Sequence, residues 1–158
     1  MIVPHTHAYV DSINISNGGI PKLPVDSVFI HEGGLQGDGH NHEKHCRPTQ
    51  AVSLQDSEKL VEINKEGYSL RAGSTGENIN VCNLDVNGLS AGTRLVFSGG
   101  VEIEITRMRP PCYVLDAIDP RLKKDILGRC GVYAKVVQEG RLVLGEKIMV
   151  RKTDKTKT

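Results

Sequence analysis

The feature that most constrains the fold of this chain is a succession of short alternating segments separated by glycine-containing turns. Polar and apolar side chains alternate along residues 8–16, 93–97 and 101–107. This is the period of a β-strand with one face buried. Turn-forming pairs, such as Asn87–Gly88 and Gly99–Gly100, stand between such segments. The pattern predicts many short strands joined by tight turns.

Two helices interrupt this series. Ser53 and Asp56 resemble a capping box in front of a helix over residues 56–66, and Asp119 with Pro120 predicts the start of a second helix that ends at Gly128. Further strands are expected at residues 27–31, 51–54 and 79–82, with a final pair, 132–137 and 142–150, around the turn 139–141.

Seven or eight strands with only two helices cannot alternate one for one, which argues against a parallel doubly wound sheet. We therefore predict a mainly β fold, a mostly antiparallel β-barrel with two short helical insertions. It forms a single domain over residues 1–150, and the charged tail, 151–158, is expected to be disordered.

The bulk properties exclude several classes of function. The net charge is +1, so no global field attracts the chain to nucleic acid or to a membrane, and an anion site has to come from a local cluster of cations. There is no apolar run of membrane-spanning length and no signal-peptide pattern, so a cytoplasmic location with reduced thiols is expected. The four cysteines form no Cys-x-x-Cys pair, which rules out a zinc-ribbon spacing and the common redox motif.

The segment that carries chemistry follows the strand 101–107. Its odd-numbered residues are apolar and face the core, and Arg107 and Arg109 share that face if the strand continues without a bulge. Buried arginines are costly, but at the mouth of a barrel they can hold an anion. Two prolines, 110–111, then end the strand and place Cys112 on an irregular rim.

The two guanidinium groups favour the thiolate form of Cys112, which is both the nucleophile and a soft metal ligand. This suits sulfur carriage as a persulfide or coordination of molybdenum. The alternative is that Cys112 is a small buried hydrophobe, with the two arginines paired to Glu102 or Glu104.

A long polar loop, 33–48, holds His40, His42 and His45 next to Cys46. Three imidazoles at this spacing can bind zinc or another divalent ion. In a glycine-rich loop they fit solvated or cavity-rim side chains equally well, so no metal site is assigned. Cys130 is expected to be a core thiol.

Several motifs occur in an order that resembles one known family. Residues 107–113 (Arg-Met-Arg-Pro-Pro-Cys-Tyr) and 128–136 look like the closing half of the MOSC domain, which is found at the C-terminus of molybdenum cofactor sulfurases. Residues 37–40 resemble the family's Gly-Asp-x-His loop, 76–79 its Gly-Glu-Asn strand start, and 143–146 its final Gly-Asp turn, with Glu in place of Asp. The resemblance extends over roughly residues 10–150 and identifies the chain as a small stand-alone member.

The resemblance implies a β-barrel with a polar pocket for the anionic molybdopterin, and a role for Cys112 in sulfur transfer or molybdenum ligation. The residues it adds to Arg107 and Arg109 as cofactor contacts are Asp38, His40, Arg47, Gln50, Glu77 and Asn78. Many relatives carry an arginine where this chain has Gln50, and Arg47 is the expected substitute.

Three functions follow from the resemblance. The first is a molybdenum-cofactor-binding protein that uses Cys112 for sulfur transfer or metal ligation. The second is a non-catalytic molybdopterin carrier that serves a molybdoenzyme partner. The third is a component of a reductase that acts on N-hydroxylated bases. Small stand-alone members of the family include proteins that protect against such bases. That activity needs an electron-donating partner, because the chain has no Gly-x-Gly-x-x-Gly loop. No pyridoxal-dependent desulfurase domain is expected, so the chain is not expected to mobilise sulfur from cysteine itself.

Overall fold

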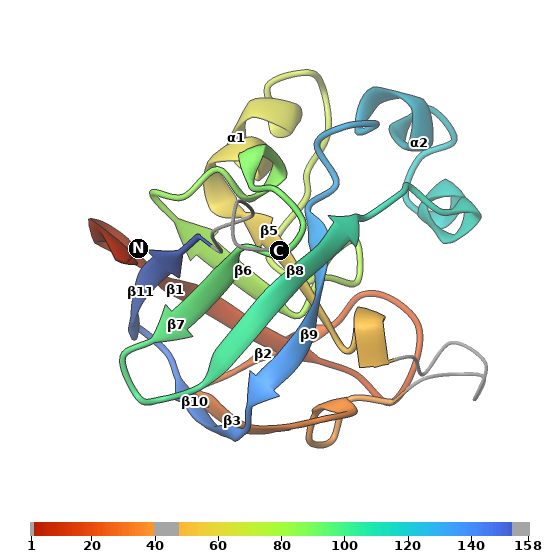
Figure 1. Ribbon diagram of the computed structural model, residues 1–158. Coiled ribbons are helices and arrows are strands. Elements are labelled where there is room, and N and C mark those ends of the chain that lie inside the picture. Colours follow the sequence, from red (N-terminus) through yellow and green to blue (C-terminus); the bar gives the residue numbers. More distant parts are fainter. Residues whose placement is uncertain (1, 40–47, 153–158) are drawn as a thin grey trace.

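The computed structural model describes residues 2–39 and 48–152 (Figure 1). Eleven strands form the framework of the described chain. They are β1 (Ile2–Ile15), β2 (Leu23–Val25), β3 (Ser27–His31), β4 (Gly34–Leu35), β5 (Val52–Asp56), β6 (Ile79–Cys82), β7 (Arg94–Phe97), β8 (Glu102–Met108), β9 (Val132–Gln138), β10 (Gly140–Val143) and β11 (Lys147–Arg151).

Seven of the strands close into a barrel. Their order is β11-β7-β8-β9-β5-β6-β1, and β1 pairs back with β11 to complete the ring. The pairings are antiparallel except for that of β5 with β6. The short strand β2 adds to β1 outside the ring, and β10, β3 and β4 form a separate three-stranded sheet. The prediction of a mainly β, mostly antiparallel barrel is confirmed.

The alternation seen in the sequence is what fills the barrel. Every second side chain of β8 and β9 points inward, so Ile103 and Ile105 meet Val132 and Ala134 in a cluster that water does not reach. Burial of such side chains is the main favourable contribution to folding, at about 25 cal/mol per Å² of apolar surface. The outward side chains of the same strands are free to be polar, and they supply the site described below.

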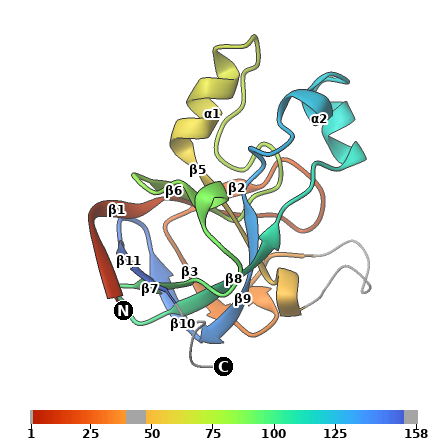
Figure 2. The same ribbon diagram turned by 45° about the horizontal axis from the view of Figure 1, so that its top comes forward.

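The helices lie together on one side of the barrel, at the top of Figure 1 and of the turned view in Figure 2. They are α1 (Ser57–Asn64), α2 (Leu122–Asp125) and the 3₁₀ turn η4 (Tyr113–Ala117). The parallel pairing of β5 with β6 needs a crossover connection, and α1 lies within it. A second hydrophobic cluster, separate from the barrel interior, holds this helical layer together; it consists of Leu60, Ile63, Tyr68, Leu70, Leu115, Leu122, Ile126 and Cys130. Two further 3₁₀ turns in the described part of the chain are η2 (Pro48–Gln50) and η3 (Val86–Gly88).

The first helix starts within one residue of its predicted position, but its predicted capping box and the predicted start of the second helix are wrong. Asp56 is the N-cap residue of α1 but makes no side-chain capping bond, and Ser53 lies within β5, where its side chain bonds to Asn78. The capping box therefore does not form. The second helix begins after Arg121, and Asp119 instead accepts a hydrogen bond from the Arg121 backbone nitrogen at 2.8 Å.

The predicted final strand pair is also wrong. The segment 142–150 is divided by a turn at Gly145, whose φ of 87° interrupts the extended backbone. The two halves, β10 and β11, then go to different partners: β10 pairs with β3, while β11 pairs with β7 and β1. The strand expected to pair with them, β9, lies between β8 and β5.

In the part of the chain that the structure describes, no helix has the length and apolar character needed to cross a membrane.

Candidate functional site

A β-bulge near the end of β8 decides where the two arginines point. Ile105 pairs with Ala134, but Arg107 pairs with Tyr133, so one residue of β8 is extra at Thr106. Ala134 faces the barrel interior, whereas Tyr133 faces outward. The expectation that Arg107 and Arg109 continue the inward face of the strand is therefore wrong. The bulge turns Arg107 onto the outer face, and Arg107 and Arg109 meet Tyr133 at one cavity there.

This cavity has a volume of about 730 Å³ and lies between the ends of the barrel strands and the helical layer. Four cationic side chains line it, those of Lys22, Arg107, Arg109 and Lys123. None of the lining residues in the described chain carries a carboxylate. The cavity therefore has a strong local excess of positive charge in a protein whose net charge is only +1, which suits an anionic ligand.

The other walls of the cavity supply neutral polar groups and the thiol. Gln50, Ser53, Asn78 and Tyr133 offer amide and hydroxyl groups. The rim is formed by the segment 110–113, which includes the exposed Cys112. The volume falls within the range of roughly 300–1,000 Å³ that is common for small-molecule sites.

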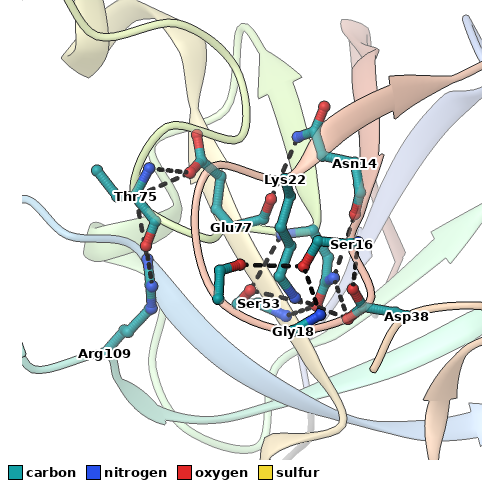
Figure 3. Close-up of polar contacts among 11 residues, drawn as sticks. Asn14, Ser16, Gly18, Lys22, Asp38, Ser53, Thr75, Glu77 and Arg109 are labelled. Atoms are coloured by element: carbon teal, nitrogen blue, oxygen red, sulfur yellow. Dashed lines mark hydrogen bonds and ion pairs between the residues drawn. The ribbon is translucent and has the colours of Figure 1, made fainter. Parts of the chain in front are cut away.

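Arg109 is held in a fixed position. Its Nη2 donates to the Thr75 carbonyl oxygen at 2.5 Å and its Nη1 to the Thr75 hydroxyl at 3.2 Å (Figure 3). Burial acts to lower the pKa of the guanidinium, but electrostatic interactions with Cys130, Tyr133 and Glu77 raise that pKa overall. The charge of Arg109 is thus maintained at the cavity wall.

Glu77 lies behind this wall rather than in it. Its side chain is fully buried and accepts four hydrogen bonds, from the backbone nitrogens of Gly73 and Thr75, the Thr75 hydroxyl and the Asn80 amide. All four donors lie within 3.2 Å. The carboxylate thus fixes Thr75, and Thr75 in turn fixes Arg109.

Asp38 holds Lys22 in position by direct contact, as an ion pair behind the cavity wall. One carboxylate oxygen accepts from the Lys22 ammonium at 2.7 Å and from the Asn78 amide at 2.9 Å, and the other accepts from the Ser16 backbone nitrogen at 3.0 Å (Figure 3). Asp38 is not a lining residue, but it directs Lys22 toward the cavity. Asn78 also accepts from the Ser53 backbone nitrogen at 3.1 Å, which ties this group to β5.

The alternative interpretation, a buried Cys112 with Arg107 and Arg109 paired to Glu102 or Glu104, is wrong. Cys112 is exposed rather than buried. Glu102 and Glu104 pair with Arg94, while Arg107 and Arg109 make no ion pair with them in the described structure. Cys130 is the core thiol that the sequence indicated, with an exposure of 1%. Burial raises its pKa, against the opposing effect of Arg109.

The structure brings together five of the residues predicted from the sequence at one cavity, namely Gln50, Asn78, Arg107, Arg109 and Cys112. Asp38 and Glu77 stand behind the wall and position two of the cations. His40 and Arg47, together with His42, His45 and Cys46 of the possible metal cluster, lie outside the described residues. Within the described chain, no group of three or more His, Cys, Asp or Glu side chains is arranged to hold a metal ion.

Sequence reasoning missed four lining residues, Lys22, Ser53, Lys123 and Tyr133. The sequence pattern places Ser53 in a helix cap, and Lys123 falls within the second predicted helix, where no motif marks it. Tyr133 lies inside the motif 128–136, which was the only available signal for it. Lys22 comes from a separate loop, and no local pattern links it to the others.

Fold and site together define a class: a closed, mostly antiparallel barrel with a cation-lined cavity and an exposed thiol at one end of its strands. The family model of the MOSC domain matches residues 41–149, and the chain belongs to the MOSC domain family. No curated protein sequence matches the chain.

Solved structures share the fold. The YuaD protein of Bacillus subtilis is 20% identical, with a TM-score of 0.75 over 93% of this chain and 97% of its own. YiiM of Geobacillus stearothermophilus is 24% identical, with a TM-score of 0.77 over 92% of this chain and 75% of its own. YiiM of Escherichia coli is 22% identical, with a TM-score of 0.64 over 98% of this chain and 72% of its own.

Proposed function

We propose that this protein binds the molybdenum cofactor in the cavity at the end of β8 and uses Cys112 for sulfur transfer or for ligation of molybdenum. The observation that carries the proposal is the combination of four cationic side chains, no lining carboxylate and one exposed thiol in a single cavity of the described structure. Molybdopterin is anionic and its metal accepts soft sulfur ligands, so the donor set of the cavity fits the group.

The cationic and the neutral side chains would bind different parts of the cofactor. Arg109 and Lys22, each fixed by a buried acceptor, would bind the anionic part of the cofactor without reorganising. Gln50, Ser53 and Asn78 would hydrogen-bond the polar pterin edge. Gln50 brings no charge, so the anionic contact rests on the arginines and on Lys22; Arg47 lies outside the described residues.

Cys112 would supply the chemistry of the chain itself. The thiolate is the reactive form of a cysteine side chain, and Cys112 is exposed at the rim of the cavity, where a reaction partner can reach it. Pro110 and Pro111 hold the segment before it in a restricted conformation. When bound, the cofactor supplies a metal centre for redox chemistry, while the chain binds it, orients it and presents sulfur from Cys112. The proposal places the protein in the cytoplasm, where the thiol stays reduced, with a molybdoenzyme or an electron donor as its partner.

The test is to purify the protein from a host that makes the cofactor and to measure bound pterin by fluorescence after oxidation, with molybdenum by elemental analysis. We expect near-stoichiometric pterin in the wild type and at least about a ten-fold weaker affinity in Arg109→Gln, which corresponds to about 1.4 kcal/mol. Arg94→Gln is the matched control, because Arg94 lies outside this cavity and pairs with Glu102 and Glu104. A wild-type protein that holds no pterin, even when it is supplied in excess, would refute the proposal.

Cys112→Ser separates the two main functions. If Cys112 acts chemically, this variant keeps pterin but loses persulfide formation or metal retention. If the protein is only a carrier, the variant delivers cofactor to a molybdoenzyme as well as the wild type does. A role as a reductase component would show as activity on N-hydroxylated bases only when an electron-donating partner is added.

A further inference from the structure

We propose that Cys112 takes sulfur directly from a small sulfane-sulfur oxoanion of the thiosulfate class, which Arg107 and Lys123 bind at the mouth of the cavity. The inference deepens the proposed function, because it names the sulfur donor of the same thiol. It adds an activity that requires no protein donor.

The four cations of the cavity fall into two groups. Lys22 and Arg109 are held by acceptors behind the wall, Lys22 by the Asp38 carboxylate and Arg109 by Thr75. Arg107 and Lys123 are exposed, and neither pairs with a carboxylate among the residues that the structure describes. Among the described residues, the Arg107 side chain donates one hydrogen bond, to the Met108 carbonyl oxygen, and this bond is long at 3.4 Å. These two cations thus have free binding capacity.

The fold sets these cations and Cys112 around one opening. Cys112 directly precedes η4 and Lys123 belongs to α2, and both elements are anchored in the second hydrophobic cluster through the buried Leu115 and Leu122. Arg107 comes from the opposite side, from the bulged end of β8. A divalent anion entering the cavity therefore meets two positive charges at the same place as the thiol.

Cys82 provides the contrast within the same chain. It is partly exposed on β6, on a different part of the surface, and its charged neighbours are Asp11 and Glu58. Burial and these two carboxylates raise the pKa of the Cys82 thiol. An anionic sulfur donor would be repelled there, so between these two described thiols the charge distribution selects Cys112.

The transfer step balances without a further reactant. The Cys112 thiolate attacks the outer, sulfane sulfur of thiosulfate and forms a sulfur–sulfur bond. The original sulfur–sulfur bond of thiosulfate breaks, and sulfite leaves with the bonding electron pair. Cys112 becomes a persulfide and no net oxidation or reduction takes place. Arg107 and Lys123 lower the repulsion between the thiolate and the anion and stabilise the charge on the leaving sulfite.

The experiment incubates the reduced full-length protein with sodium thiosulfate. It follows sulfite release, and it follows the gain of one sulfur atom by intact-protein and peptide mass spectrometry. We expect the sulfur on Cys112 and not on Cys82, with Cys82→Ser as a control that loads normally. Arg107→Gln and Lys123→Gln should each slow loading about ten-fold, and Arg107→Lys should recover most of the rate. Added salt should slow the wild type more than the double variant.

Alkylation by iodoacetamide, which is uncharged, distinguishes anion binding from a change in the thiol itself. The charge variants should react with iodoacetamide at rates close to that of the wild type. If both reagents slow equally, or if thiosulfate loads Cys82 as fast as Cys112, the inference is wrong. Absence of loading in a protein that binds molybdopterin would reject the thiosulfate donor and leave the proposed function in place. If Cys112 takes up sulfur only from a persulfide-bearing protein, thiosulfate is likewise rejected as the donor.

Discussion

At the scale of single residues, the site depends on buried groups that never touch the cavity. Arg109 is fixed by Thr75, and Thr75 is fixed by the fully buried Glu77. Lys22 depends in the same way on Asp38. The sequence singled out both carboxylates, because they lie in motifs shared with the family. Their indirect action could not be predicted, since it depends on which donors the folded chain places around them.

Glu77→Gln tests the role of this buried carboxylate. The amide keeps one acceptor oxygen but points an N–H₂ group at donors that the second carboxylate oxygen now satisfies. We expect the free energy of unfolding to fall by about 1–3 kcal/mol, as measured by urea denaturation. Glu62→Gln is the control: its side chain is 61% exposed and pairs with Arg129, so the loss there should stay below about 1 kcal/mol. Equal losses in the two variants would contradict the role assigned to Glu77.

At the scale of elements, the bulge in β8 and the glycine that precedes β9 shape the cavity together. Arg109 donates its backbone N–H to the Gly131 carbonyl oxygen at 3.0 Å, which extends the ladder beyond the end of β8. Gly131 has a φ of 81°, and a Cβ there would lie 1.9 Å from the Leu54 carbonyl oxygen. Only glycine lets the chain pass this close to β5. The alternation of polar and apolar residues predicted β8 and β9. It predicted neither the bulge in β8 nor the close approach of Gly131 to β5.

Gly131→Ala should therefore be strongly destabilising. Two costs combine, the left-handed backbone and a contact with backbone atoms that cannot move aside, and we expect a loss of about 3 kcal/mol or more. Gly128→Ala is a matched control, because Gly128 has the same φ of 81° but nothing within 4 Å of the added Cβ. It should cost only about 1 kcal/mol. Thermal unfolding monitored by circular dichroism compares the two, and a Gly131 variant as stable as the Gly128 variant would disprove the close approach.

At the scale of the whole molecule, the protein consists of a barrel core and a smaller helical layer with its own hydrophobic cluster. The cavity lies where the two meet. Arg107 and Arg109 come from the barrel side, and Cys112 and Lys123 from segments anchored in the helical layer. The geometry of the site therefore depends on how the helical layer packs against the barrel.

Leu122→Ala tests this dependence. Leu122 is fully buried in the second cluster, and we expect a loss of about 2–5 kcal/mol in unfolding free energy. Hydrogen exchange should accelerate first in residues 112–127, while the barrel strands stay protected. Leu127→Ala is the control, since Leu127 is 70% exposed and its removal should change stability by no more than about 0.5 kcal/mol. Exchange that accelerates uniformly over the barrel would contradict the two-cluster description.

The sequence by itself determined the strand-rich architecture, because alternation with a period of two specifies which face of each strand is buried. It also identified the thiol and its two neighbouring arginines, which stand together within residues 107–112. Local order in the chain carries that information directly.

Only the tertiary structure decided which side of the barrel those residues face and what else they meet. A single extra residue in β8 reversed the expected direction of Arg107. Lys22, Ser53, Lys123 and Tyr133 reach the same cavity from four separate segments. These residues come together because the sheet closes and the helical layer packs against it. Both events join segments that are far apart in the sequence.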